Sequence, residues 1–249
     1  VLNPTNNPID GYKLEEVPHS NKVVPPRIGS SFNCGGLVGP VELRVLPAVR
    51  IADVFAVPDV ARGAFRVQVT LRNDTPELVP ARLSATIAPA HGAGDAIEAA
   101  WEQMVEAAPG ESLYTLELCL RQPHLWDLDD PYLYRLGLRL EGKLGTGRPL
   151  AHEYSLRCGL RDFRVERGFF RLNGRRVFLR STHTGNHFPI GQHIPVDPDH
   201  LRRDLINAKA SGFNMVRFIA GMAIPEQLDL CDELGLMVYE ECNAAWCLA

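Results

Sequence analysis

The sequence predicts an antiparallel β-sandwich followed by a parallel α/β region, and three observations support this fold class. From Ile51 to Leu140, apolar and polar residues alternate repeatedly with a period of two, which places one face of each strand in a core and the other in water. After Arg180, apolar residues instead form short continuous runs separated by helical stretches, as expected of strands buried on both faces. Between the two regions, Asn173-Gly174 separates two apolar runs, Phe169–Leu172 and Val177–Leu179. Both residues tolerate positive φ, so the pair predicts a tight β-hairpin at the junction.

Several short alternating strands predict that the first region is immunoglobulin-like. Its strands are expected at Phe65–Leu71, Leu83–Ile87, Tyr114–Leu120 and Tyr132–Leu140. Such strands with turn residues between them, over roughly 110 residues, are typical of an antiparallel sandwich of immunoglobulin type. An earlier short strand is expected at Val41–Leu46, ended by Pro47. The Ala-rich stretch 90–100 contains Gly92 and Gly94, which favour a loop over a helix.

The second region shows helix start and stop signals between its apolar runs. Asp197 is a suitable N-cap followed by Pro198, and Gly212 occupies the position of a C′ glycine. A second helix is expected over Pro225–Leu234, ended by Gly235. The buried strands are expected at Phe213–Ile219 and Leu236–Tyr239. Strand–helix–strand connections of this length predict parallel strands, so a doubly wound sheet and the first third of an eight-stranded barrel both stay open.

Composition and charge exclude several classes of function. Of the 249 residues, 45% are hydrophobic and 22% are charged, as in ordinary globular proteins. The formal net charge is −4, without a long run of like charge, so we expect no nucleic-acid partner and no anionic membrane surface. No apolar run approaches the ~18 residues that a membrane span needs. The nucleotide-binding motifs GxGxxG and GxxxxGK[ST] follow none of the predicted strands, and we expect no cofactor.

The cysteines do not indicate a metal site. All six lack CxxC spacing. Cys242 and Cys247 are the pair nearest to each other, but their spacing matches no zinc pattern. We therefore expect buried or incidental thiols and no bound metal.

Polar side chains follow the ends of the three predicted parallel strands, where ligands bind in α/β folds. The candidate substrate-binding residues are His183, Asn186 and His187 after the first strand, Arg217 at the end of the second, and Glu240, Glu241, Asn243 and Trp246 after the third. Carboxylates, amides, imidazoles, an arginine and an indole suit a ligand with many hydroxyl groups, which hydrogen bonds and ring stacking recognise. For Trp246, stacking on a sugar ring and plain burial are both open.

The other candidates also have structural interpretations. A metal pair and ordinary loop contacts are the alternatives for His183 and His187. Arg217 interrupts an apolar strand, where an unpaired charge is costly, so it requires either a ligand or a carboxylate such as Glu240 or Glu241. Adjacent residues on a strand point to opposite faces, so at most one of these two glutamates faces the ligand.

Several segments of the chain, in a fixed order and spacing, resemble a known family. They are Leu125-Trp126-Asp127, Pro131-Tyr132-Leu133-Tyr134, Gly159-Leu160-Arg161, Phe170–Arg180, Lys209–Arg217 and Leu230–Tyr239. Together they resemble family 2 glycoside hydrolases from the end of the immunoglobulin-like domain onward. Gly35–Pro47 is similar to the last strand of that family's N-terminal jelly roll.

The resemblance implies an architecture of three parts. These are the end of a jelly-roll sugar-binding domain in 1–47, an immunoglobulin-like β-sandwich in 48–162, and the first three βα units of a TIM (β/α)8 barrel in 163–249. Arg217 matches the arginine that ends the second barrel strand and helps to build the sugar site. Ser181–Thr184 differs from the glycine and the Asn or Asp of many members. Glu240–Asn243 is not followed by the acid and histidine that hold magnesium in some members, so neither galactosidase specificity nor a metal is implied.

The same resemblance implies the chemistry. Members are retaining β-glycosidases, which hydrolyse O-glycosidic bonds in β-linked sugars with two carboxylates in a double displacement. In the family these carboxylates follow the fourth and seventh barrel strands. Both are therefore expected beyond residue 249, no catalytic residue is assigned within this chain, and the expected partner is a carbohydrate substrate.

Two alternatives stay open at this point. The first is a non-catalytic carbohydrate-binding or scaffold protein, which has the same fold but lacks the two catalytic carboxylates. The second is a self-contained two-domain protein, in which the α/β half is a small open sheet. The chain begins with Val1 rather than Met, so we expect a piece of a longer protein, for which cytoplasmic, periplasmic and secreted locations are open. A homo-oligomeric parent protein is open as well.

Overall fold

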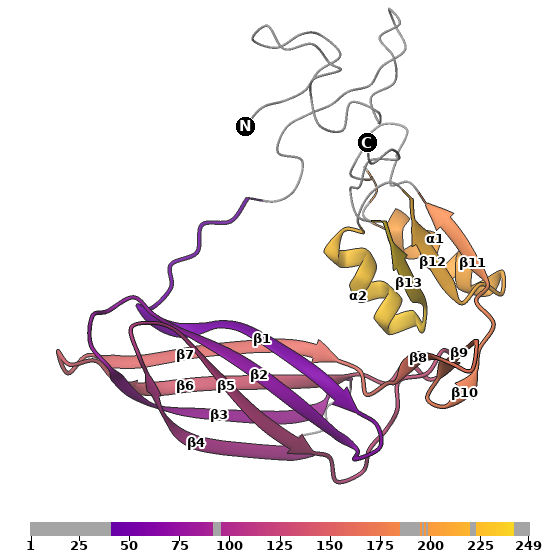
Figure 1. The fold of residues 1–249 in the computed structure, drawn as a ribbon. Helices are drawn as coiled ribbons and strands as arrows, with labels where there is room; N and C mark the ends of the chain where they lie inside the picture. The colour runs from indigo at the N-terminus through magenta and orange to yellow at the C-terminus, as the bar shows by residue number, and fades with distance from the viewer. Residues whose placement is uncertain are drawn as a thin grey trace, which may run out of the picture. The chain divides into compact units, whose positions relative to one another are not determined.

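The computed structural model describes residues 41–91, 96–184, 195, 197, 199–219 and 223–241 (Figure 1). Within this part, one compact unit comprises Arg44–Arg180 and Asp229–Met237, and the other centres on Ser181–Leu228 and the residues from Val238. The two units are described in turn.

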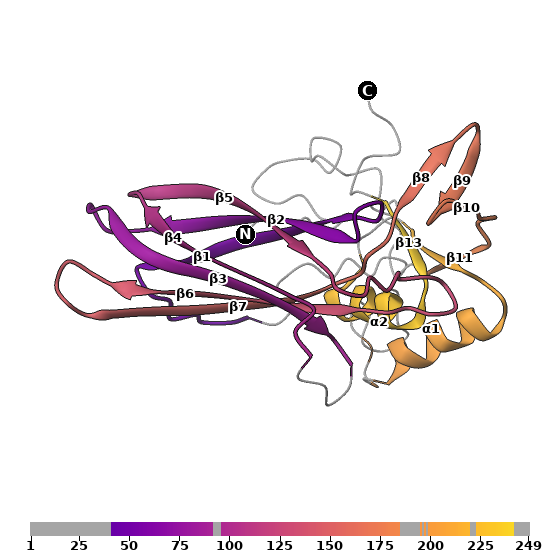
Figure 2. The same cartoon turned by 90° about the horizontal axis from the view of Figure 1, so that it is seen from below.

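Two antiparallel sheets build the sandwich of the larger unit. Its strands are β1 (Val49–Asp59), β2 (Ala64–Asn73), β3 (Val79–Pro89), β4 (Ala99–Ala107), β5 (Gly110–Cys119), β6 (Tyr134–Lys143) and β7 (Pro149–Cys158). One sheet has the order β1-β2-β5 and the other has the order β4-β3-β6-β7, and Figure 2 shows them as two layers. The predicted immunoglobulin-like sandwich is therefore confirmed. The strands expected from alternation do not include β1, β4 or β7, which are edge strands of the two sheets and have weaker contrast between their two faces.

The core lies between the two sheets and is filled by the alternating residues of the central strands. Phe65 and Leu71 of β2 and Leu83 of β3 are fully buried, as is Tyr134 at the start of β6. The Tyr134 hydroxyl accepts a hydrogen bond from the His124 backbone N–H at 2.8 Å, which satisfies the one polar atom of this ring inside the core. Burial raises the pKa of Tyr134 to about 12.

The same unit includes Asp229–Met237, which contains the second half of helix α2 (Pro225–Leu234) and the residues that follow it. Trp126 donates its indole N–H to the backbone carbonyl of Asp232 at 2.8 Å. Arg157, at the end of β7, forms ion pairs with Asp229 and Glu233 on the helix. These contacts attach the last turns of α2 to the end of the sandwich.

A small three-stranded meander follows the sandwich. Its strands are β8 (Phe163–Glu166), β9 (Phe169–Leu172) and β10 (Arg175–Arg176), in the order β10-β9-β8. Asn173 and Gly174 have φ values of 50° and 77°, so the predicted tight hairpin is confirmed. The apolar run Val177–Leu179 is not a strand, however. The hairpin is shorter than predicted because β10 pairs with β9 over two residues only.

The smaller unit contains a sheet with helices on its connections. Strand β11 (Ser181–Thr184) precedes helix α1 (His200–Ala210), strand β12 (Met215–Phe218) follows it, and α2 leads to strand β13 (Met237–Glu240). The sheet order is β11-β12-β13, and β11 and β12 run parallel. This succession matches the predicted strand–helix units, and three strands fit both a doubly wound sheet and the start of a barrel.

Two local predictions in the α/β region need correction. Strand β11 consists of the polar residues that were expected to follow the first strand, so His183 lies within the strand and not in the loop after it. The N-cap of α1 is Asp199 and not Asp197. The Asp197 carboxylate instead accepts the Asp199 backbone N–H at 2.9 Å and forms an ion pair with Arg203. Asp197 thus lies two residues before the N-cap and contacts the first turns of the helix. Pro198 lies outside the described residues.

The strand predicted at Val41–Leu46 is absent from this described segment. Val41, Leu43 and Val45 are 81%, 95% and 93% exposed, because no described strand pairs with them. Residues 1–40, on which the predicted jelly roll mainly rests, lie outside the described residues, as do positions 92–95 of the Ala-rich stretch. No helix in the described part is long and apolar enough to cross a membrane.

Candidate functional site

The candidate site lies at the carboxyl ends of β12 and β13. Arg217 is the third residue of β12, and in the parallel register it is paired with His183 of β11. Paired residues of neighbouring strands share a face of the sheet. The side chain of Arg217 is 48% exposed, whereas Val216 and Phe218 on either side of it are buried. The strand therefore presents the Arg217 cation on its exposed face, opposite to the buried face formed by Val216 and Phe218.

Glu241 is the carboxylate partner of Arg217. The guanidinium donates from Nε to Glu241 Oε1 at 2.7 Å, and Nη2 donates to the same oxygen. The Glu241 backbone N–H in turn donates to the Phe218 carbonyl at 3.4 Å, so the glutamate is held at the end of the neighbouring strand. The requirement for a carboxylate partner is thus met, and the ion pair is exposed on one side.

Tyr239 adds an aromatic ring to this pair. The Arg217 guanidinium carbon lies 5.8 Å from the centre of the Tyr239 ring, within the range of a cation–π contact. Tyr239 is 53% exposed. Sequence reasoning did not select Tyr239, although its place in the last predicted strand, two residues before Glu241, is the signal that would have found it.

Glu240 has a different role from that of Glu241. Its carboxylate accepts the backbone N–H of Ala223 at 2.9 Å, which ties the segment after β12 to the end of β13. The two adjacent glutamates thus bind different partners, as the alternation of a strand requires. Glu240 supports the loop, and Glu241 orients the arginine.

The structure describes only half of the predicted site residues. His183, Arg217, Glu240 and Glu241 are described, and His183 is exposed on β11. Asn186, His187, Asn243 and Trp246 lie outside the described residues. Among the residues that are described, no group of three or more His, Cys, Asp or Glu side chains is arranged to hold a metal ion. Free thiols in that part are Cys119, Cys158 and Cys231, and none of them is on β11, β12 or β13.

Comparison with known families assigns both halves of the chain. Glycosyl hydrolases family 2 matches residues 49–161. The TIM barrel domain of the same family matches residues 163–247, so the two matches follow each other at the junction between sandwich and meander. The chain belongs to glycoside hydrolase family 2. The parallel strands are therefore the start of a barrel, and the alternative of a small open sheet is set aside.

Relatives within the family are much longer than this chain. It is 34% identical over 130 residues to a β-galactosidase of Vibrio cholerae serotype O1, a match that covers 52% of this chain and 12% of that protein. It is 26% identical over 218 residues to a β-galactosidase of Oenococcus oeni, which covers 85% of this chain and 21% of that protein. The matches thus span about a fifth or less of the length of these two relatives.

Solved structures support the same fold. The chain superposes with a TM-score of 0.64 and 23% identity on β-glucuronidase 2 of Bacteroides uniformis, covalently bound to cyclophellitol-6-carboxylate aziridine. The superposition covers 78% of this chain and 24% of that one. At this level of identity the likeness supports the architecture of sandwich and barrel start.

Proposed function

We propose that the protein is a retaining β-glycosidase to which this chain contributes the sandwich and the first part of the barrel. Membership of glycoside hydrolase family 2 supports the reaction class. The observation that carries the proposal is the exposed Arg217–Glu241 pair beside Tyr239 at the strand ends. Ligands of TIM barrels bind at this end of the strands.

The arrangement suits recognition of sugar hydroxyl groups. A guanidinium that already holds one carboxylate oxygen keeps further N–H donors for a ligand. An aromatic ring next to such donors and acceptors packs against the C–H face of a sugar. We assign Arg217, Glu241 and His183 to the walls of the sugar site and Glu240 to loop support. The same proposal includes Asn186, His187, Asn243 and Trp246 in the substrate-binding set.

The catalytic carboxylates are proposed to come from later barrel strands. A retaining enzyme needs one carboxyl group that protonates the leaving oxygen and a second that attacks the anomeric carbon, about 5–5.5 Å apart. Of the carboxylates at the described strand ends, Glu240 is held by a backbone N–H and Glu241 by Arg217. Both are structural supports in this arrangement, so the acid/base and the nucleophile are expected beyond residue 249.

The test is hydrolysis of aryl β-glycosides by the full-length protein. For the full-length protein we expect turnover with retention of anomeric configuration, which NMR of the first product formed detects. For residues 1–249 alone we expect no turnover. Inversion would overturn the double-displacement mechanism, because inverting enzymes use their two carboxylates in a single displacement by water. Sugar binding by the full-length protein without any hydrolysis would indicate the non-catalytic carbohydrate-binding alternative. Sedimentation of the same sample decides between a monomer and a homo-oligomer.

A further inference from the structure

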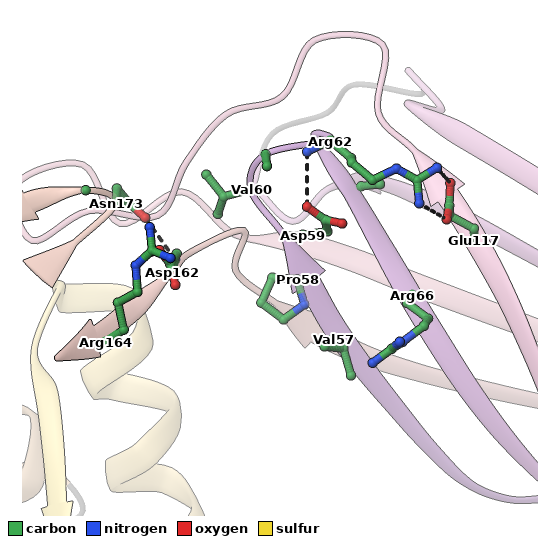
Figure 3. A pocket seen from close by; sticks show the side chains of 13 residues that line it. Val57, Pro58, Asp59, Val60, Arg62, Arg66, Glu117, Asp162, Arg164 and Asn173 are labelled. Atoms are coloured by element: carbon green, nitrogen blue, oxygen red, sulfur yellow. Dashed lines mark hydrogen bonds and ion pairs between the residues drawn. The ribbon is translucent and has the colours of Figure 1, made fainter. Parts of the chain in front are cut away.

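A hollow of about 540 Å³ lies within the larger unit, between the β1–β2 hairpin and the start of the meander (Figure 3). One wall comes from Val57 to Ala64 with Arg66 and Glu117, and the other comes from Asp162, Arg164, Asn173 and Gly174. Small-molecule sites typically measure about 300–1,000 Å³, so the hollow is large enough for a ligand of one sugar unit. None of these residues belongs to the site at the strand ends, and the inference does not rest on the proposed glycosidase activity.

Three arginines line the hollow, and two of them have carboxylate partners. Arg62 donates from both terminal nitrogens to Glu117, at 2.6 and 2.7 Å. Arg164 pairs with Asp162 at 3.1 Å. Both pairs are drawn in Figure 3, on opposite walls. Their charges are therefore neutralised within the protein.

Arg66 is the third arginine, and its charge is not compensated. In the antiparallel register of β2 and β5 it is opposite Glu117, but Arg62 already holds both oxygens of that carboxylate. The Arg66 side chain is exposed and forms no hydrogen bond or ion pair with any of the described residues. One planar guanidinium is thus available to a ligand, and its fork of N–H donors matches a carboxylate in two parallel hydrogen bonds.

The charge of the lining limits which anion fits. Asp59 joins the two paired carboxylates, so the lining carries as many carboxylates as guanidiniums. Because the lining is neutral overall, a bound monocarboxylate leaves one net negative charge and a doubly charged phosphate leaves two, so the lining disfavours the dianion more. The lining therefore favours a monocarboxylate.

The rest of the lining indicates the body of the ligand. Asp59 Oδ1 accepts the Arg62 backbone N–H at 3.1 Å, which leaves its carboxylate with further capacity to accept hydrogen bonds from hydroxyl groups. Val57, Pro58 and Val60 supply small apolar surfaces against which C–H groups can pack. We propose that this hollow binds a small polyhydroxylated monocarboxylate, a sugar acid, with its carboxylate on Arg66 and its hydroxyl groups on Asp59.

Calorimetric titration of the full-length protein with gluconate tests the proposal. Sorbitol is the matched uncharged probe because it differs only in the group that replaces the carboxylate, and inorganic phosphate is the dianionic probe. We expect saturable gluconate binding that Arg66→Gln weakens about tenfold or more, as for loss of a charged hydrogen-bond partner. Arg66→Lys keeps the charge without the fork and should give an intermediate loss. Arg135→Gln, at another exposed arginine on the sandwich, is the matched control and should bind as wild type does.

The outcomes separate cleanly because Arg66 is exposed and its replacement should not unfold the protein, which thermal unfolding checks. Equal gluconate affinity in Arg66→Gln and wild type would overturn the proposal, as would the absence of saturable binding by wild type. Sorbitol binding as tight as gluconate binding would show that the carboxylate is not recognised. Phosphate binding tighter than gluconate binding would refute the charge argument.

Discussion

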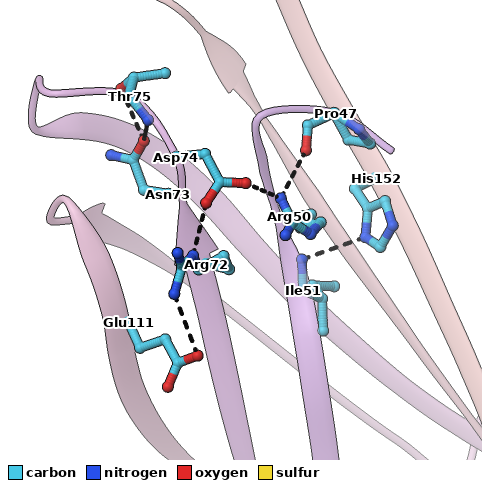
Figure 4. Close-up of polar contacts among 9 residues, drawn as sticks. All are labelled: Pro47, Arg50, Ile51, Arg72, Asn73, Asp74, Thr75, Glu111 and His152. Carbon is cyan, nitrogen blue, oxygen red and sulfur yellow. Dashed lines mark hydrogen bonds and ion pairs between the residues drawn. The ribbon is translucent and has the colours of Figure 1, made fainter. Parts of the chain in front are cut away.

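Replacement of Asn73 by alanine should destabilise the sandwich more than any exposed substitution in it. Asn73 ends β2 and is only 2% exposed. Its amide group donates to the backbone carbonyls of Glu77 at 2.7 Å and Ala107 at 2.8 Å. Its carbonyl oxygen accepts from the backbone N–H and the hydroxyl of Thr75, at 2.9 and 2.7 Å (Figure 4). Because Ala107 ends β4, one side chain links the two sheets at this end of the sandwich.

The magnitude follows from which partners water can reach after the substitution. The bond to Ala107 is buried, whereas those to Glu77 and Thr75 are partly exposed. A buried carbonyl left without a partner costs about 1–3 kcal/mol, and each exposed bond contributes about 0.5–1.5 kcal/mol. With one buried bond and three partly exposed bonds lost, the free energy of unfolding should fall by about 2.5–7.5 kcal/mol, out of a typical 5–15 kcal/mol for a domain.

Urea unfolding of Asn73→Ala measures this loss directly. The unfolding midpoint should fall with an unchanged m-value, and Tm should fall by roughly 5–30 °C. Gln103→Ala is the matched control, because Gln103 is an exposed amide on β4, and it should change stability by less than about 0.5 kcal/mol. If Asn73→Ala and Gln103→Ala lose equal stability, the link between the sheets does not have the assigned role.

Three further predictions concern other parts of the chain. In the full-length protein, Arg217→Lys should lower kcat/KM for an aryl β-glycoside about tenfold or more with little change in Tm. The reason is that lysine keeps the positive charge but lacks the planar, forked set of N–H donors of a guanidinium. A fall in Tm that accompanies the loss of activity would instead indicate a structural ion pair. His152 accepts the Ile51 backbone N–H at its Nδ1, and burial followed by the nearby arginine lowers its pKa below 6.5. The folded state then binds fewer protons than the unfolded state, so the contribution of His152 to the free energy of unfolding should be fully present above about pH 6.5 and decline as the pH falls through the lowered pKa. His152→Leu should remove this dependence of the free energy of unfolding on pH. An unchanged pH dependence in His152→Leu would refute the assignment to His152. Gly235→Ala should lower the free energy of unfolding by about 1–3 kcal/mol, because Gly235 has a φ of 69° and an added Cβ would clash with a backbone carbonyl. Gly147 has a φ of 79° but open space around its Cα, so Gly147→Ala is the control that has only the cost of the positive φ. Equal losses in the two variants would show that the clash at Gly235 does not affect stability.

Periodicity and turn chemistry determined much of the fold before any contact was known. The period of two correctly located β2, β3, β5 and β6, because each of these strands is long enough to alternate between a core face and a solvent face. The positions that need a positive φ could also be predicted from the sequence. Asn173 and Gly174 adopt positive φ at their turn, and Gly212 and Gly235 do so at the ends of the two helices. Such features depend on residues close in sequence, so the sequence alone specifies them.

The choices between equivalent partners required the tertiary structure. The sequence offered Glu240 and Glu241 equally to Arg217, and the register at the end of β13 gave the arginine Glu241 and left Glu240 for the Ala223 backbone. The hollow beside Arg66 was likewise unreadable, because its two walls come from segments about 100 residues apart, joined only by the folded chain. Sequence determined which strands and turns form, since those depend on neighbours along the chain. Only packing decided which side chains meet, since register and strand order set distances between residues far apart in sequence.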